Sequence, residues 1–87
     1  MLWQIKFEEG ARRSLEKLDK PIRQQIENYL DRLLTLENPR LRGKGLTASR
    51  SGQWRYRVGD YRIICEIKDN ILVVLVLEIG HRSKIYE

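Results

Sequence analysis

A nine-residue segment near the carboxyl end, from Ile71 to Ile79, restricts the fold of this chain more than any other feature. Only Glu78 interrupts its apolar character, and most of its residues are β-branched. This composition and the flanking turn residues favour a strand over a buried helix. A strand this apolar must be covered on both faces, which predicts the central strand of a sheet. A chain of 87 residues has room for one core, so we expect a single domain spanning 1–87.

The amino-terminal half predicts one strand followed by two helices. Residues 2–7 alternate between apolar and polar side chains, the pattern of a half-buried strand. From Glu8 to Leu18 the apolar residues recur at helical spacing. Pro21 suits the first turn of a second helix, whose apolar stripe ends before Asn38-Pro39. The two helices are expected to form an antiparallel hairpin.

The carboxyl-terminal half predicts a loop followed by three strands. Residues 40–52 are rich in glycine, serine and basic side chains, which indicates a loop. The segments 54–58 and 61–68 alternate around the turn residues Gly59-Asp60, as in a β-hairpin. With the strand at 71–79, the predicted order is βααβββ. This is an α+β fold in which an antiparallel sheet carries a two-helix hairpin on one face.

The net charge of +5 is concentrated in one part of the chain. Residues 1–39 are neutral overall, and residues 63–87 carry a net charge of −1. Residues 40–62 hold seven basic side chains against the single acid Asp60, a net charge of +6. A basic segment interleaved with aromatic residues on strands favours a binding site for a polyanion.

Three arginines are expected to share the face of the sheet that the helices leave uncovered. Alternation places Arg55 and Arg57 opposite the apolar face of their strand, about 7 Å apart. Pairing across the hairpin brings Arg62 beside Arg57. Clustered guanidinium groups suit phosphate, which arginine binds through two parallel hydrogen bonds. We therefore expect RNA contacts from Arg55 and Arg57, and from the loop residues Arg42, Lys44 and Arg50.

Several kinds of chemistry are excluded by what the sequence lacks. Cys65 is the single cysteine and His81 the single histidine, so neither a disulfide within the chain nor a structural metal site is expected. No nucleotide-binding motif is present, and no cofactor is expected. No segment reads as a signal peptide or membrane helix, so the expected compartment is the cytoplasm.

Cleavage of RNA needs none of these features, because the 2′-hydroxyl of the substrate can attack its own adjacent phosphate. The protein then supplies orientation, charge stabilisation and proton transfer. His81 can exchange protons near neutral pH, and the nearby Arg82 and Tyr86 can hold a phosphate or stack on a base. The sequence thus predicts a catalytic group of Arg62, His81, Arg82 and Tyr86.

The segment Trp54–Arg62 (WRYRVGDYR) resembles the W-R-x-R-x-G-x-Y-R signature of RelE-like toxins in the RelE/ParE superfamily. The ending Gly80–Tyr86 (GHRSKIY) is similar to the family ending G-H-R-x-x-[VI]-Y. Leu41-Arg42-Gly43, with Leu46, is similar to the loop that precedes the signature. The βααβββ order matches as well, so the resemblance covers nearly the whole chain and implies a fold of the RelE and microbial-ribonuclease type.

The resemblance implies the toxin of a type II toxin–antitoxin system, held in a hetero-oligomeric complex by a RelB-like antitoxin. RelE-like members cut mRNA in the A site of the 30S ribosomal subunit, in contact with rRNA. By residue match, Arg62 is implied to stabilise the phosphate, Arg82 to help the leaving group, and Tyr86 to stack or orient. The strand residues Arg55 and Arg57 stand where lysine is common. Because arginine keeps its proton, either His81 transfers more of the protons or the phosphate is activated electrostatically.

Two alternatives belong to other functional classes. A ParE-like member of the superfamily would poison DNA gyrase by binding and would not be an enzyme. A non-catalytic module would bind RNA or the ribosome through the basic face without turnover. The presence of His81, Arg82 and Tyr86 favours RNA cleavage over the ParE-like alternative.

Overall fold

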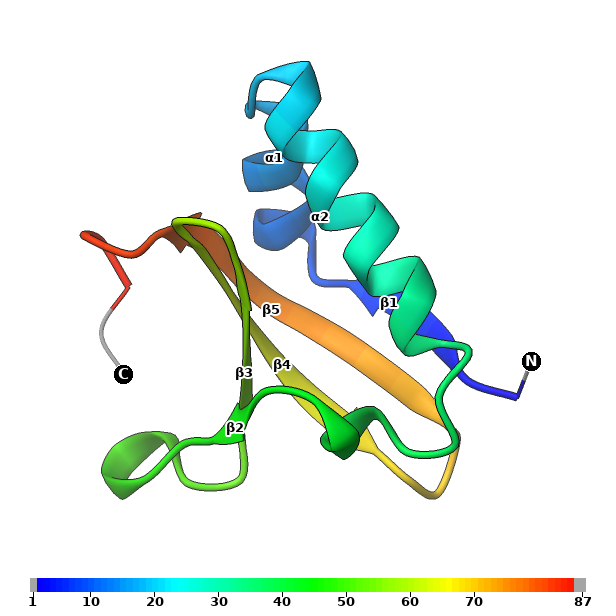
Figure 1. The fold of residues 1–87 in the computed structure, drawn as a ribbon. Helices are drawn as coiled ribbons and strands as arrows, with labels where there is room; N and C mark the ends of the chain where they lie inside the picture. Colours follow the sequence, from blue (N-terminus) through cyan, green and yellow to red (C-terminus); the bar gives the residue numbers. More distant parts are fainter. Residues whose placement is uncertain (1, 86–87) are drawn as a thin grey trace.

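A five-stranded sheet and two helices make up the structure, a computed structural model that describes residues 2–85 (Figure 1). Two short 3₁₀ turns, η1 and η2, lie in the segment between the helices and the β-hairpin. The elements in chain order are β1 (Gln4–Phe7), α1 (Glu9–Glu16), α2 (Lys20–Leu33), η1 (Pro39–Leu41), β2 (Lys44–Gly45), η2 (Ala48–Arg50), β3 (Trp54–Val58), β4 (Tyr61–Lys68) and β5 (Val73–His81).

The sheet is mixed rather than purely antiparallel. Its strand order is β1-β5-β4-β3-β2, and β1 pairs with β5 in parallel, with Gln4 opposite Val73. The other neighbours are antiparallel. The predicted α+β class with a helix pair on one face is confirmed, but the antiparallel direction of the first strand was wrong. A period-two pattern identifies a strand without specifying its direction.

The predicted central strand lies inside the sheet but starts later than expected. The expected span was 71–79, whereas β5 covers Val73–His81. Residues 69–72 form the preceding turn, in which Leu72 has a φ of +54° and Ile71 is 59% exposed. The turn is apolar enough to read as part of the strand, so hydropathy alone misplaced the boundary.

Both helices pack on the same side of the sheet, and the chain leaves the end of β5, over residues 82–85, toward the other side (Figure 1). From α2, Ile26 and Leu30 are buried, and the ring of Tyr29 meets the ring of Tyr56 at 5.8 Å between centroids. Tyr56 comes from β3, so this contact ties the helix layer to the basic hairpin. Buried residues of this core also include Ala11, Leu15, Leu33, Ile63, Cys65, Val74, Val76 and Ile79.

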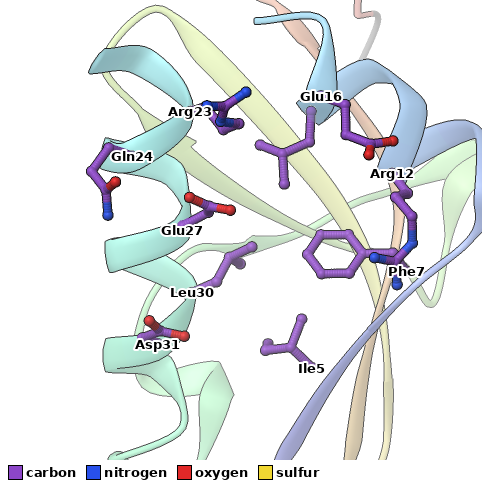
Figure 2. Close-up of a pocket in the computed structure, with 10 residues that line it drawn as sticks. Ile5, Phe7, Arg12, Glu16, Arg23, Gln24, Glu27, Leu30 and Asp31 are labelled. Carbon is purple, nitrogen blue, oxygen red and sulfur yellow. The ribbon is translucent and has the colours of Figure 1, made fainter. Parts of the chain in front are cut away.

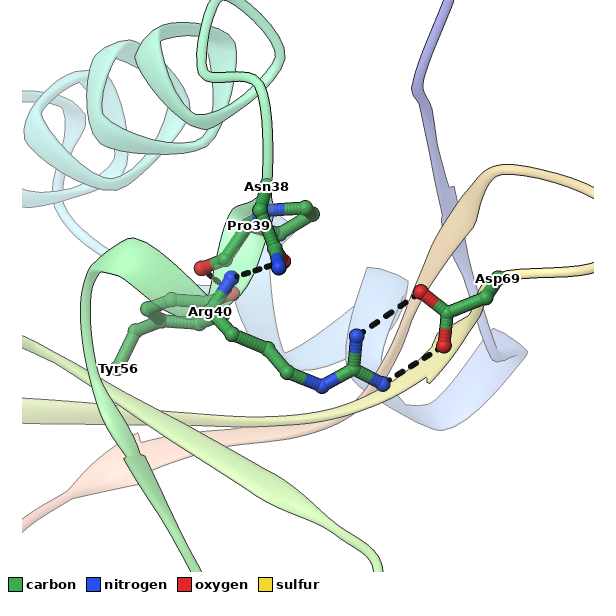
Figure 3. A network of polar contacts seen from close by, with 5 residues as sticks. All are labelled: Asn38, Pro39, Arg40, Tyr56 and Asp69. Atoms are coloured by element: carbon green, nitrogen blue, oxygen red, sulfur yellow. Dashed lines mark hydrogen bonds and ion pairs between the residues drawn. The ribbon is translucent and has the colours of Figure 1, made fainter.

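The segment after α2 was predicted to be a loop, and the structure attaches it to the sheet at two points (Figure 3). The hydroxyl of buried Tyr56 donates to the carbonyl of Pro39 at 2.8 Å. Arg40 forms two hydrogen bonds with the carboxylate of Asp69, at 2.9 and 2.8 Å, and these lower the pKa of Asp69. The loop therefore begins from a fixed position, and its short strand β2 pairs with β3.

Replacing Tyr56 with phenylalanine tests this attachment. The change keeps the ring and leaves the Pro39 carbonyl without its donor, so we expect a loss of about 1–2 kcal/mol in the free energy of unfolding. Chemical denaturation monitored by circular dichroism measures it. Tyr61→Phe, at a half-buried position on the neighbouring strand, is the matched control. Equal stability of the wild type and Tyr56→Phe would show that the bond does not hold the loop.

Candidate nucleic-acid interface

The strand register aligns residues in two rows across the face of the sheet opposite the helices. The first row runs through Lys44, Arg55, Ile64 and Glu78, from β2 to β5. The second row runs through Arg57, Arg62 and Gly80, from β3 to β5. We call this surface, defined by the two rows, the arginine face. The predicted pairing of Arg57 with Arg62 is confirmed.

Arg62 is held firmly on this face. It is only 8% exposed, and its Nη1 donates to the carbonyls of Gly59 and Tyr61 at 3.2 and 3.1 Å. Both carbonyls belong to the β3–β4 hairpin, so the guanidinium is fixed to the turn beside it. A charge with so little freedom needs little reorganisation to stabilise an anion.

The other basic residues of the rows are more accessible. Arg57 is exposed and Arg55 is half-buried. Arg55 also lines a cleft of about 280 Å³ with Lys44, Leu46 and Thr47. The arginine face thus presents a firmly held guanidinium in the middle and basic side chains toward β2, an arrangement suited to a chain of phosphates.

The loop that carries η2 reaches back over the first row. Its ends are joined by a hydrogen bond from the amide of Leu46 to the carbonyl of Gln53, at 3.0 Å. From this loop, Arg50 contacts Glu78 of β5 at 2.5 Å. That hydrogen bond raises the pKa of Arg50. Ile64 lies between Arg55 and Glu78 in the row and is fully buried, which shows that this part of the arginine face is covered.

The charge of the basic segment is partly offset by acids from elsewhere in the fold. Arg40 pairs with Asp69, and Arg50 with Glu78. The sequence placed Arg50 among the RNA contacts, but in this structure its guanidinium is bound to a carboxylate. Counting charges along the chain could not reveal these partners, because they come from the following segment.

Arg42 is close to the helix layer. Burial raises the pKa of Tyr29, and the nearby charge of Arg42 partly opposes that rise. Tyr29 belongs to α2, so the charge of Arg42 acts on a residue of the helix layer. The main chain of Arg42 is fixed as well, because the indole Nε1 of Trp54 donates to its carbonyl at 2.7 Å. The structure therefore does not place Arg42 with the other predicted RNA contacts.

Of the predicted tail residues, His81 lies on the face of the sheet opposite Arg62. His81 is paired with Tyr61, and their rings meet edge to face at 5.5 Å. Tyr61 packs against the helix-side core, so His81 is on the face opposite Arg62. Arg82 is anchored to the β3–β4 turn, with its amide donating to the carbonyl of Asp60 at 2.8 Å. Tyr86 lies outside the described residues.

Glu78 is the residue of the arginine face that sequence reasoning missed. The sequence shows it only as the single acid in an apolar strand, and that single acid was the signal that could have identified it. An acid within an otherwise apolar strand needs a polar surrounding, which Arg50 provides.

Two further observations concern residues 2–85. They hold no group of three or more His, Cys, Asp or Glu side chains placed to bind a metal ion. None of the helices described has the length and apolar composition needed to span a membrane. Cys65 is fully buried, and burial raises the pKa of its thiol, as expected for a residue that fills the core.

Comparison with known proteins agrees with the fold and with the sequence motifs. A family model described as the ParE toxin of the type II toxin–antitoxin system parDE matches residues 5–86. Toxin RelG of Mycobacterium tuberculosis is 33% identical over 86 residues, covering 99% of this chain and 98% of RelG. A putative RelE-like toxin protein of Escherichia coli is 28% identical over 85 residues, covering 97% and 87% of the two chains.

Solved structures give the same classification. The RelBE2 toxin–antitoxin complex of Mycobacterium tuberculosis contains a chain that matches with a TM-score of 0.80 and 29% identity, over 94% of this chain and 100% of that one. The isolated RelE toxin of Escherichia coli shares the fold, with a TM-score of 0.75 and 21% identity over 91% and 83%. Fold and motifs thus define a toxin of a type II toxin–antitoxin system. The chain belongs to the ParE toxin family, within the RelE/ParE superfamily.

Gly43, in the motif before the basic strand, gives a test of how the interface is supported. Its φ is +78°, and a Cβ there would overlap the Arg55 carbonyl oxygen and lie 2.7 Å from Trp54 Nε1. Gly43→Ala should lower the free energy of unfolding by about 2–4 kcal/mol, from backbone strain and overpacking. Gly59→Ala is the control, because its φ is +57° with no atom within 4 Å. If denaturation shows a similar loss of unfolding free energy in both variants, backbone strain explains the loss and overpacking does not contribute.

Proposed function

We propose that this toxin is an endoribonuclease that cuts mRNA in the A site of the ribosome and so blocks translation. The observation that carries the proposal is the pairing of Arg57 with the buried Arg62 on the face of the sheet opposite the helices. Each guanidinium group can donate two parallel hydrogen bonds to a phosphate, so two adjacent groups suit an RNA backbone. The similarity to RelG and to the RelBE2 toxin supports the same assignment.

In this mechanism the 2′-hydroxyl of the substrate attacks the adjacent phosphate and the 5′-oxygen leaves. Arg62, fixed by the hairpin carbonyls, stabilises the charge that develops on the phosphate. Arg55 and Arg57 hold neighbouring phosphates, and Lys44 extends the contact toward β2. Arg82 and Tyr86 are proposed to complete the site when the tail meets the ribosome and mRNA. DNA is excluded as a substrate because it has no 2′-hydroxyl.

The second candidate is a toxin that binds DNA gyrase without cutting RNA. The match to the ParE family model favours it, and so does the placement of His81 away from the arginine face. The two candidates differ in their products, so a single biochemical assay separates them.

Adding the purified chain to ribosomes programmed with a defined mRNA should yield cut RNA with 2′,3′-cyclic phosphate and 5′-hydroxyl ends. Primer extension and end analysis detect them. Arg62→Ala should slow cleavage by about 10²-fold or more, the order seen when one preorganised donor is removed. Intact mRNA together with inhibited gyrase supercoiling would replace this proposal with the second candidate.

Two controls accompany that assay. Arg57→Ala should weaken ribosome binding more than it slows the bound reaction, and should reduce the salt dependence of binding. Because Arg62 also supports the β3–β4 turn, Arg62→Lys and a thermal unfolding measurement separate loss of chemistry from loss of fold. Arg62→Lys keeps the positive charge and loses the bidentate geometry.

We also propose that a RelB-like antitoxin neutralises this toxin in a hetero-oligomeric complex, as the RelBE2 antitoxin accompanies its toxin. A groove between α1, α2 and β1, on the helix side of the sheet, gives it a binding place in addition to the arginine face (Figure 2). Its floor is apolar, with Ile5, Phe7 and Leu30, and its volume is about 410 Å³. Charged side chains of both signs surround the floor: Arg12, Glu16, Arg23, Glu27 and Asp31.

An apolar floor within a charged rim should give binding that depends on salt only in part. Gln24→Arg places a long charged side chain at the groove and should weaken antitoxin binding about 10-fold, or about 1.4 kcal/mol. Gln25→Arg is the control, because Gln25 faces a different cleft toward the β3–β4 turn. Titration calorimetry across a salt series gives both quantities, and equal affinities of the two variants would exclude the groove.

A further inference from the structure

We propose that Glu78 is a catalytic residue that accepts the proton of the RNA 2′-hydroxyl. This inference rests on the proposed ribonuclease function. It supplies a general base, which the arginines cannot provide. Arginine keeps its proton under all ordinary conditions, so an arginine face alone has charge stabilisation without a base. Among the residues described on the two rows, Glu78 is the one carboxylate.

An irregularity in β5 turns Glu78 onto the arginine face. Val74 and Val76 are fully buried in the helix-side core, so strict alternation would carry Glu78 into that core too. The register shifts at this point instead: Cys65 pairs with Val76, whereas Ile64 pairs with Glu78, which leaves Leu77 as an extra residue. A bulge of this kind re-aims the side chains that follow it, and bulges are frequent beside active sites.

The shift places Glu78 diagonally from Arg62. Arg62 pairs with Gly80, and Glu78 lies two residues earlier on the same face of β5. Diagonal neighbours on adjacent strands are about 7–8 Å apart, a separation that side chains of this length can bridge. The carboxylate and the guanidinium can therefore reach one phosphodiester from two sides, with the acid at the ribose and Arg62 at the phosphate.

A cleft of about 410 Å³ adjoins Glu78 at the edge of the sheet, where β5 extends beyond its pairing with β1, and gives the nucleoside a place to enter. It is lined by β5, by the tail residues Lys84 and Ile85, and by the small residues Gly10, Ala11 and Ser14 of α1. Its volume lies within the range of small-ligand sites. Because Glu78 is 43% exposed along its side chain, a hydroxyl in this cleft can reach it.

The charged groups that face Glu78 from the neighbouring elements are basic. Arg50 of η2 contacts Oε2, which leaves the Oε1 side for a substrate hydroxyl. Arg62 of β4 is its diagonal neighbour, Arg55 of β3 lies in the same row, and Lys84 lines the same cleft. The residues that α1 adds to the cleft are small and uncharged.

The step balances without any added reagent. The 2′-oxygen gives its proton to the Glu78 carboxylate and bonds to phosphorus, while the bond from phosphorus to the 5′-oxygen breaks. The departing 5′-oxygen takes a proton from water, and Glu78 returns its proton to solvent. The products are a 2′,3′-cyclic phosphate and a 5′-hydroxyl.

Single-turnover cleavage on programmed ribosomes tests the assignment, with rate and ribosome binding measured separately across acidic and neutral pH. Glu78→Gln should slow the bound reaction by about 10²–10⁴-fold, the usual contribution of a general base. The decline of the wild-type rate toward acid pH should disappear in this variant. Removing an acid from a basic face should leave ribosome binding as tight as before or tighter.

Two variants separate proton transfer from anchoring of the loop. Glu66→Gln makes the same change on β4 at a carboxylate that pairs with Lys68, 2.9 Å away, and should behave as the wild type. Arg50→Gln breaks the same ion pair from the other side. It should lower the rate much less than Glu78→Gln and should keep the acid-side decline.

Each contrary result has a distinct meaning. Equal slowing by Glu78→Gln and Arg50→Gln, with weaker ribosome binding in both, would overturn the catalytic role in favour of an anchor. A pH dependence that Glu78→Gln leaves intact and His81→Gln removes would transfer the role to His81. A wild-type chain that cuts no mRNA would overturn the proposed function and this role together, whereas cleavage at the wild-type rate by Glu78→Gln would overturn the role alone.

Discussion

The position of β5 inside the sheet is the constraint on which the rest of the structure depends. On one edge it pairs with β1 and on the other with β4, and α1 packs against it. Its valines Val74 and Val76 are fully buried beneath the helices. Because one strand serves the helix-side core and the arginine face, any change in its register alters both surfaces. The bulge at Leu77 lets this nine-residue strand direct Val74 and Val76 into the core and Glu78 onto the arginine face.

On the arginine face, repulsion between like charges is opposed by nearby carbonyl and carboxylate groups. Arg57 and Arg62 are direct neighbours across the hairpin, which is unfavourable unless counter-charges or dipoles oppose it. The hairpin carbonyls offset part of the charge at Arg62, and Glu78 offsets part of the charge at Arg50. The proposed RNA substrate would bring further negative charge to this face through its phosphates.

Local patterns predicted the elements, and long-range pairing decided the details that matter for the site. Alternation was enough to place Arg55 and Arg57 on one face, because adjacent side chains on a strand must point in opposite directions. The same rule could not reveal a bulge, so neither Glu78 on the arginine face nor His81 on the opposite face was anticipated. The partners of Arg40 and Arg50 are 29 and 28 residues away in the chain, beyond the reach of any local pattern. Hydropathy likewise misread the turn at Ile71 and Leu72, where apolar residues occupy turn positions.

The parallel pairing of β1 with β5 has a consequence for the moment at which the chain becomes active. Gln4 finds its partner in Val73, so nearly the whole sequence must be made before the sheet can close. Contacts this distant along the chain form late, after the helices have had time to fold locally. During its own synthesis the chain therefore lacks the strand that carries Glu78 and pairs with Arg62. A toxin that acts on ribosomes would in this way spare the ribosome that is making it.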